Sequence, residues 1–408
     1  MIFFQEYKNQ LIYWLTILFS ILFLFVGYKV CKPDTENTPQ GGQCFSAKVI
    51  SIEDKTINSY TLGEDETSPT FENTTIRFSA IITNGALKHS VVEGIQNMDG
   101  IAAVNPKEVK IGDSILITSA EEHPSPTSLW DFVEYDRSFP LALLCGFFFL
   151  LLLLFGGKKG GNTILSLIFT CIAIFAVYIP SIEKGYSIYI TSTIICVFIV
   201  FMNLLLLNGA NIKTLCAILG NLGGLLVSGV LTLFMNNILN ITGLVDNDAA
   251  FLLLQSTTAS IDLKGIVWSG ILIGSLGAIM DVAMSIASAL QELSENIEIE
   301  HRRFSTFLRS GLNIGRDAMG TMTNTLILAY IGSSLAMALL LILNSNDMLW
   351  LFNLEMIVVE ILQSLTGSIG ILCAIPITSA ASAYLYTLPS KKPMAYEEDT
   401  PDFFTKEE

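Results

Sequence analysis

Residues 277–290 read Gly-Ala-Ile-Met-Asp-Val-Ala-Met-Ser-Ile-Ala-Ser-Ala-Leu, and residues 313–330 read Asn-Ile-Gly-Arg-Asp-Ala-Met-Gly-Thr-Met-Thr-Asn-Thr-Leu-Ile-Leu-Ala-Tyr. Both stretches lie in runs that are apolar and long enough to cross a bilayer. Each nevertheless carries carboxylates or amides, which are costly in hydrocarbon. We therefore expect the polar residues of these two stretches to be functional.

Composition agrees with a membrane protein, because 51% of the 408 residues are hydrophobic and apolar stretches of about 20 residues recur along the chain. The sequence predicts an α-helical polytopic membrane protein with about eight transmembrane helices and a small extracellular β-rich domain between the first and second. The predicted spans are 10–30, 139–156, 163–182, 186–207, 213–239, 266–290, 316–343 and 365–386.

The short connections predict the orientation, because Lys and Arg near span ends favour the cytoplasm. Most of these residues fall on one side, so both termini are expected to be cytoplasmic in a bacterial cell membrane. A cleaved signal peptide is the alternative for the first span. The predicted division is a transmembrane helix (1–30), the extracellular domain (31–138), a seven-helix membrane domain (139–386) and a disordered cytoplasmic tail (387–408).

The outer region 31–138 is acidic, with 17 Asp and Glu against 8 Lys and Arg. This balance disfavours nucleic acid as a partner. Short β-branched runs predict strands at 47–53, 75–82, 89–93 and 115–118, and residues 110–113 predict a tight turn. Cys31 and Cys44 face outward and either pair as a disulfide or remain free thiols. No spacing typical of a metal site occurs, and no cofactor is expected.

Two stripes of small and polar residues follow three- and four-residue steps, which place each stripe on one helical face. In the sixth span the stripe is Gly270, Gly274, Gly277, Asp281 and Ser285, and in the seventh it is Asn313, Asp317, Gly320, Thr321 and Asn324. We expect the two stripes to face each other along a pathway, with Asp281 inside the protein. Arg316 would then pair with Asp281 or Asp317, or reach the interface. The alternative is helix packing plus an interfacial ion pair.

Three neighbouring segments complete this interpretation. Residues 304–312 are amphipathic and predict a cytoplasmic interfacial helix. Residues 348–363 predict an outer amphipathic or re-entrant helix, on which Glu355 and Glu360 would capture cations at the mouth of the pathway or remain solvated. Gly367 and Gly370 open the eighth span. Together with the glycines of the two stripes, they predict close helix packing; those glycines are Gly270, Gly274, Gly277 and Gly320.

Three motifs carry a resemblance to a known family. Residues 277–289, 315–330 and 367–378 occur in that order, and the region 140–386 resembles the YibE/F-like family of bacterial multipass membrane proteins. The resemblance implies a strand-rich outer region after the first span and a permease-like role, but it supplies no substrate. A fainter similarity links the intramembrane Asp and the following Thr/Asn-rich span to proton-driven translocase modules of the SecD/SecF and resistance-nodulation-division type, which have six spans per unit.

The leading hypothesis is a component of a transporter or exporter, in which Asp281, Arg316 and Asp317 form a protonatable or cation-binding relay. Its partners would be the bilayer, a small solute, ion or peptide, and further copies of the chain. The competing hypothesis is a receptor or assembly scaffold that binds a ligand through the β domain. An enzyme is not expected, although Asp281 and Asp317 could meet as a catalytic dyad.

Overall fold

The chain forms two compact units, Met1–Pro33 with Gly157–Glu408, and Asp34–Gly156, each of which is described by itself. A computed structural model describes residues 2–32, 43–61, 70–99, 107–121, 124–245, 247–255, 261–298, 302–344 and 347–388. The predicted tail 387–408 lies outside these residues from 389 onward.

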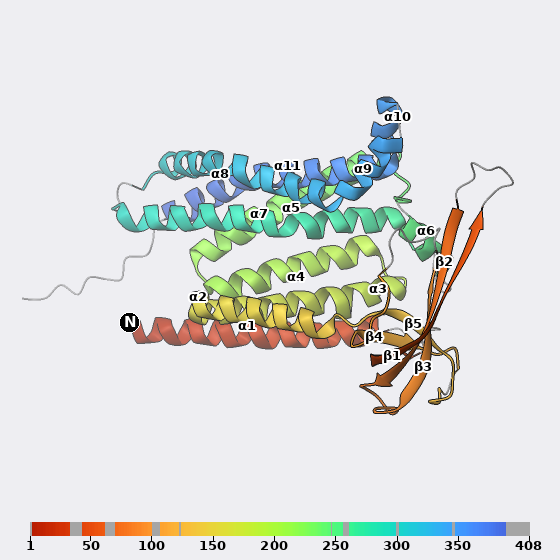
Figure 1. The fold of residues 1–408 in the computed structure, drawn as a ribbon. Helices are drawn as coiled ribbons and strands as arrows, with labels where there is room; N and C mark the ends of the chain where they lie inside the picture. Colours follow the sequence, from red (N-terminus) through yellow and green to blue (C-terminus); the bar gives the residue numbers. More distant parts are fainter. Residues whose placement is uncertain are drawn as a thin grey trace, which may run out of the picture. The chain divides into compact units, whose positions relative to one another are not determined.

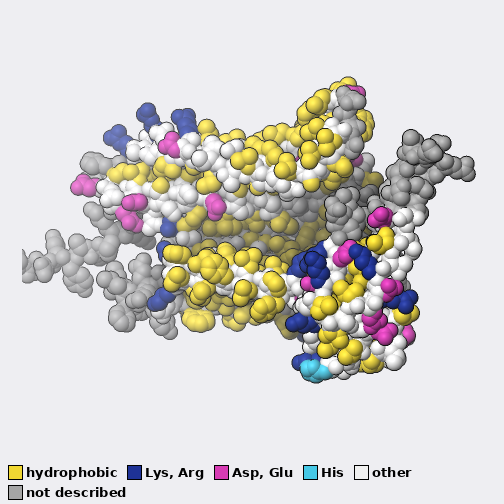
Figure 2. Space-filling view, in the orientation of Figure 1, with side chains coloured by type: hydrophobic (Ala, Val, Ile, Leu, Met, Phe, Trp, Pro, Cys, Tyr) yellow, Lys and Arg dark blue, Asp and Glu magenta, His cyan; other side chains and the backbone are white. Residues whose placement is uncertain are grey.

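The larger unit is helical (Figure 1). Its elements are α1 (Ile2–Cys31), the part of α2 (Ser138–Ile172) from Gly157 onward, η1 (Ala173–Tyr178), α3 (Ile179–Glu183), α4 (Ile188–Asn208), α5 (Ile212–Ile238), α6 (Asn247–Gln255), α7 (Leu263–Asn296), α8 (Phe304–Ser333), α9 (Leu335–Asn344), α10 (Met348–Phe352) and α11 (Glu355–Thr387). Figure 2 shows mainly hydrophobic side chains along these helices, with Lys and Arg gathered at the end where α8 begins.

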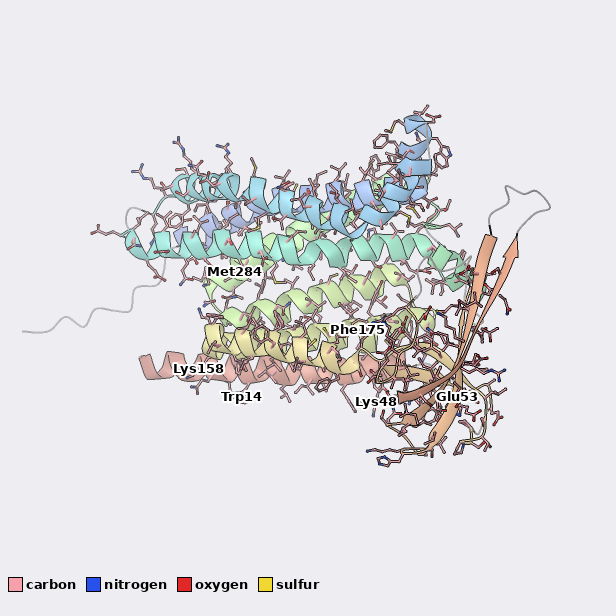
Figure 3. All side chains as sticks on the ribbon, viewed as in Figure 1. Trp14, Lys48, Glu53, Lys158, Phe175 and Met284 are labelled. Atoms are coloured by element: carbon pink, nitrogen blue, oxygen red, sulfur yellow. The ribbon has the colours of Figure 1, made fainter. Side chains whose placement is uncertain are left out.

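The predicted polytopic helical class is confirmed by the length and composition of these helices. Within the described residues, six helices are long and apolar enough to cross a membrane, or up to seven when the bent pair α8 and α9 is counted as one span. One of the six is the 46-residue segment Ser138–Glu183. Its backbone leaves helical values at Gly157 (φ 52°, ψ −127°), directly before Lys158, which Figure 3 labels.

The centre of the helical unit is α11, which packs against α5, α7 and α8. The backbones of α5 and α11 approach closely at Gly224, where a Cβ would lie 2.7 Å from the carbonyl oxygen of Gly370. Because that atom belongs to the backbone, only glycine fits at position 224 without moving a helix. A buried hydrogen bond of 2.8 Å from the Trp268 indole N–H to the carbonyl oxygen of Gly229 joins α7 to α5.

Two segment predictions are wrong. Residues 304–312 do not form a separate interfacial helix, because α8 runs without a break from Phe304 to Ser333. A bend of 60° then separates α8 from α9. Residues 355–363 are likewise the first turns of α11, so the last span begins about ten residues earlier than expected. Apolar residues flank the charged ones in both segments, and the packing of those apolar residues extends the helices.

The smaller unit contains a closed five-stranded barrel with the strand order β1-β2-β3-β5-β4. In this barrel β3 and β5 are parallel, and the other neighbouring strands are antiparallel. The sheet closes on itself in the order found in OB-type barrels, while the outer parts of β1 and β2 extend beyond the barrel as a two-stranded hairpin. The strands are β1 (Phe45–Thr61), β2 (Thr70–Ile82), β3 (Val91–Met98), β4 (Ser114–Thr118) and β5 (Trp130–Tyr135).

The predicted β-rich domain is therefore present, with longer strands than expected and a fifth strand that the prediction missed. Trp130 of β5 is fully buried and packs edge-on against Phe45. The predicted turn at 110–113 is confirmed, with Gly112 at φ 92° and the Asp113 carboxylate accepting from the Lys110 N–H at 3.0 Å. His89 lies in a turn at φ 71° and not in a strand. Glu53, labelled in Figure 3, lies on β1 and accepts a hydrogen bond from the Ser79 hydroxyl.

The start of α2 is fixed by a side chain that directly follows β5. The carboxylate of Asp136 accepts from the Ser138 N–H at 3.0 Å and also from the Ser138 hydroxyl. These bonds favour the ionised form, and the hydroxyl makes the largest contribution to holding the pKa of Asp136 below its usual range. The stabilisation is therefore present above the ordinary aspartate pKa of about 3.9 and is lost as the pH falls through the lower folded pKa.

The contact between α5 and α11 predicts that Gly224→Ala destabilises the helical unit by about 1–3 kcal/mol, because the added methyl group meets a backbone oxygen. Thermal unfolding in detergent measures the loss. The matched control is Gly332→Ala on α8, where a Cβ meets nothing within 4 Å. Because alanine has a higher helix propensity than glycine, Gly332→Ala should be as stable as wild type or more stable. Equal stability of the two variants would contradict the proposed contact.

The hydrogen bonds of the ionised Asp136 carboxylate predict that the stability of the junction between β5 and α2 depends on pH. Asp136→Ala should increase hydrogen exchange in residues 130–145 at pH 6, because the capping carboxylate is lost, and the difference from wild type should vanish near pH 2. The effect is about 1 kcal/mol or less, as for other helix-start residues. Asp131→Ala, which removes an exposed carboxylate of β5, is the control. A difference that persists at low pH would refute the role of the charge.

Candidate functional site

The stripe on α7 lies on the exposed face of that helix. Apolar side chains such as Ile279, Val282 and Ile286 bury the opposite face. The stripe comprises Gly270, Gly274, Gly277, Asp281 and Ser285, all of which are exposed. The prediction that Asp281 sits inside the protein is therefore wrong for the single chain. The apolar side chains are larger, so they fill the contact with the bundle and leave the small and polar residues outside.

Asp281 lies near the middle of α7, a helix of 34 residues. Its carboxylate makes no hydrogen bond or ion pair with any residue that the structure describes. The Ser285 hydroxyl donates to the backbone oxygen of Asp281 at 2.7 Å and leaves the carboxylate free. Half-buried Met284, one turn away, is labelled in Figure 3 and helps to locate this level of the helix. An unpartnered carboxylate near the middle of a helix long and apolar enough to cross a membrane is the least expected group in the helical unit.

The stripe on α8 is exposed as well, whereas Phe307, Gly311 and Leu326 bury the opposite face. Asn313, Arg316, Asp317, Gly320, Thr321 and Asn324 are all exposed. The Thr321 hydroxyl donates to the Ala318 carbonyl oxygen at 2.9 Å, within its own helix. The two stripes therefore do not meet in a buried interface, contrary to the prediction.

The predicted ion pair of Arg316 is also not formed. Among the described residues the ion pairs are Lys55–Glu108 and Arg137–Glu134, both in the smaller unit. Within the described residues, the carboxylates of Asp281 and Asp317 both lie more than 4.0 Å from the charged nitrogen atoms of Lys, Arg and His. The physical reason is that the buried faces of α7 and α8 are apolar, which turns the charged residues outward.

The glycines predicted to pack helices behave in two ways. A Cβ on Gly367 would lie 2.9 Å from a Leu326 methyl carbon, and one on Gly370 would lie 3.0 Å from a methyl carbon of Ile279, so both are in tight contacts. A Cβ on Gly270, Gly277 or Gly320 meets no atom within 4 Å. For these last three the structure gives no close helix contact, because they lie on the exposed stripes.

Gly274 is the glycine of the α7 stripe that does lie in a tight contact, as the packing prediction expected. A Cβ there would lie 2.6 Å from the Tyr330 hydroxyl oxygen of α8 and 3.4 Å from Nε2 of Gln363 on α11. Glycine thus allows a tyrosine to approach the stripe of α7. The Tyr330 hydroxyl is buried and lies beside the Gln363 side chain. The sequence prediction missed Asn221 of α5: its amide is fully buried, with both polar atoms unpartnered in the described part of the chain.

The two carboxylates predicted at the pathway mouth have different environments. Glu355 accepts from the Thr242 N–H at 2.7 Å, the Thr242 hydroxyl at 2.8 Å and the Gly243 N–H at 2.6 Å. It therefore holds the turn after α5 and is not available to a cation. Glu360 is half-buried and lines a cavity of about 450 Å³. Capture of a cation by Glu360 stays a prediction.

Cys31 is buried and forms no disulfide within the described residues, so the predicted outward position of this thiol is wrong. No group of three His, Cys, Asp or Glu side chains that could hold a metal ion occurs within the described residues.

Several apolar helices of bilayer length, packed through small residues, define a polytopic helical membrane protein. An isolated carboxylate lies near the middle of one of them, α7. The family model described as "YibE/F-like protein" matches residues 144–388, which is more than half of the chain. The protein belongs to the YibE/F-like family, as the three motifs predicted. No curated protein and no solved structure matches the chain.

The hydrogen bonds that Glu355 accepts from Thr242 and Gly243, here called the Glu355 clamp, predict the effect of removing its carboxylate. Glu355→Ala should lower the free energy of unfolding by about 1–3 kcal/mol, because the Thr242 and Gly243 donors lose a charged acceptor. Thermal unfolding in detergent measures the loss. The control is Glu360→Gln on the same helix, which breaks no hydrogen bond within the described residues and should unfold like wild type. If the two variants were equally unstable, the clamp would not be the cause.

Proposed function

We propose that this protein is a component of a membrane transporter or exporter, and not an enzyme, with Asp281 as the residue that carries a proton or cation. The observation that supports this most is the unpartnered carboxylate near the middle of α7, on a face of small residues. A permanently charged carboxylate facing hydrocarbon would cost several kcal/mol. Evolution usually retains such a group in a membrane span for a pathway or a proton relay.

The proposal includes eight membrane crossings in a bacterial cell membrane. The segment Ser138–Glu183 has 46 residues and would be roughly 69 Å long as one helix, over twice the bilayer core. The break at Gly157 would divide it into two crossings. With the bent pair α8 and α9 as one further span, the total is eight, which would leave both termini on the same side. The exposed arginines near the start of α8 and the Lys158-Lys159 turn favour the cytoplasm for that side.

The proposed chemistry needs only one carboxyl group that changes protonation. When protonated, Asp281 is neutral and tolerates contact with lipid, and when ionised it requires water or a cation. A conformational change that brings Arg316 or Asp317 toward Asp281 would alter its proton affinity. The stripe of small residues provides a surface along which helices, or a further copy of the chain, can slide closely.

A receptor or assembly scaffold is the alternative from another class. It is favoured by the barrel, which is a compact unit with its own buried core around Trp130 and Phe78. Barrels of the OB type present an outer face and loops on which ligands bind. In that case the barrel would be indispensable and Asp281 would not be.

The experiment that tests the proposed function is proton or cation flux into proteoliposomes under an imposed pH gradient, with purified wild type and Asp281→Asn. We expect flux in wild type and loss of at least ten-fold in the variant, because asparagine cannot take up and release a proton. The matched control is Glu292→Gln, an exposed carboxylate near the end of α7, which should keep the flux. Full flux in Asp281→Asn refutes the relay, and absence of flux in wild type favours the receptor.

A further inference from the structure

The bend between α8 and α9 borders a cavity of about 450 Å³ that four helices line. Tyr330 comes from α8, Ala338 from α9, Leu351 from α10 and Glu360 from α11, while Ser334 lies at the bend itself. The remaining lining residues are apolar apart from Ser364. The volume lies within the range of small-molecule sites, which are mostly apolar with a few fixed polar groups.

Among the described residues that line the cavity, Glu360 is the only charged one. Within the described part of the chain its carboxylate has no hydrogen bond and no ion pair, in contrast to Glu355 five residues earlier on the same helix. A carboxylate in apolar surroundings is unfavourable unless a cation lies beside it. The cavity therefore provides a negative charge for which the described residues supply no counter-charge.

Two aromatic residues add to this preference. Tyr330 and Phe352 both line the cavity, and aromatic ring faces attract organic cations. The Tyr330 hydroxyl itself lies beside Gly274 and Gln363, so the ring is the part of Tyr330 that adds to this preference. A bare metal ion fits poorly, because Ca²⁺ and Mg²⁺ require about six oxygen ligands and the cavity offers one carboxylate and a few hydroxyl groups.

We propose that this cavity binds a lipophilic organic cation, with Glu360 as the counter-ion and the apolar walls holding its hydrocarbon substituents. The inference rests on the proposed function in taking Glu360 as the outer carboxylate of the transport pathway, and it adds the class of substrate. It requires no contact between the cavity and Asp281. Tyr330 nevertheless connects the two places, since it lines the cavity and its hydroxyl lies beside Gly274 of the α7 stripe.

The experiment is equilibrium binding of tetraphenylphosphonium to the full chain in lipid nanodiscs, with empty nanodiscs subtracted. Tetraphenylborate has the same shape and the opposite charge, so that it separates charge from hydrophobicity. We expect wild type to prefer the phosphonium, and Glu360→Gln to weaken its binding about ten-fold or more, since the isolated charge pair lies in apolar surroundings. Ala338→Phe, which fills the cavity, should weaken the binding of both probes. Glu292→Gln is the matched control and should bind like wild type.

The possible results separate this inference from the proposed function. If wild type does not bind the phosphonium, or if Glu360→Gln binds it as tightly as wild type does, the inference is overturned, even when Asp281-dependent flux is present. If Ala338→Phe alone weakens binding, the cavity holds acyl chains and not cations, which also overturns it. If binding depends on Glu360 while proteoliposomes show no flux, the cation site stands and the transport proposal fails.

Discussion

The helical unit depends on the contact between the backbones of α5 and α11 at Gly224 and Gly370. In a membrane the apolar surface of a helix gains little from leaving lipid, so that helices associate through close van der Waals contact. Glycine at both positions lets the two helices approach until a carbonyl oxygen fills the space of a side chain. The other helices follow from this contact. Gly315 of α8 meets Ile375 of α11, and Gly367 of α11 lies against Leu326 of α8 and Ser275 of α7.

Most polar residues in the spans are satisfied within their own helix and mark no site. The hydroxyl groups of Ser275, Thr366, Thr378 and Ser379 each donate to the carbonyl oxygen four residues earlier. A carboxylate has no proton to donate in this way, and a fully buried amide needs partners for two donors and an acceptor. Asp281, Glu360 and Asn221 therefore differ in kind from the many hydroxyls around them, and this difference, not polarity alone, distinguishes candidate sites from packing.

Sequence reasoning predicted the features that depend on local chemistry. Apolar runs of bilayer length predicted the helices, and the outer β-rich domain followed from β-branched runs and turn residues. The motif residues predicted the family, which the match over 144–388 confirms. Sequence reasoning missed the features that depend on contacts between distant segments. The strand β5 is short and pairs with β3 and β4. The residues that contact Gly274, Tyr330 and Gln363, come from two other helices and were not predicted. The prediction that both stripes face inward failed because helical periodicity places residues on a common face but does not say which face is buried.

Glu355 and Glu360 show why charge in a sequence does not by itself identify a site. Five residues along a helix correspond to a rotation of about 140°, so that the two carboxylates point in different directions. Glu355 lies at the start of α11 next to the turn after α5, whose backbone N–H groups it accepts from. Glu360 points toward the space left where α8 bends away, and no donor of the described chain reaches it. Glu355 fixes the start of α11, and the position of Glu360 depends on that helix. Glu355 therefore has a structural role and Glu360 is the candidate for binding, because only Glu360 lies next to the bend between α8 and α9.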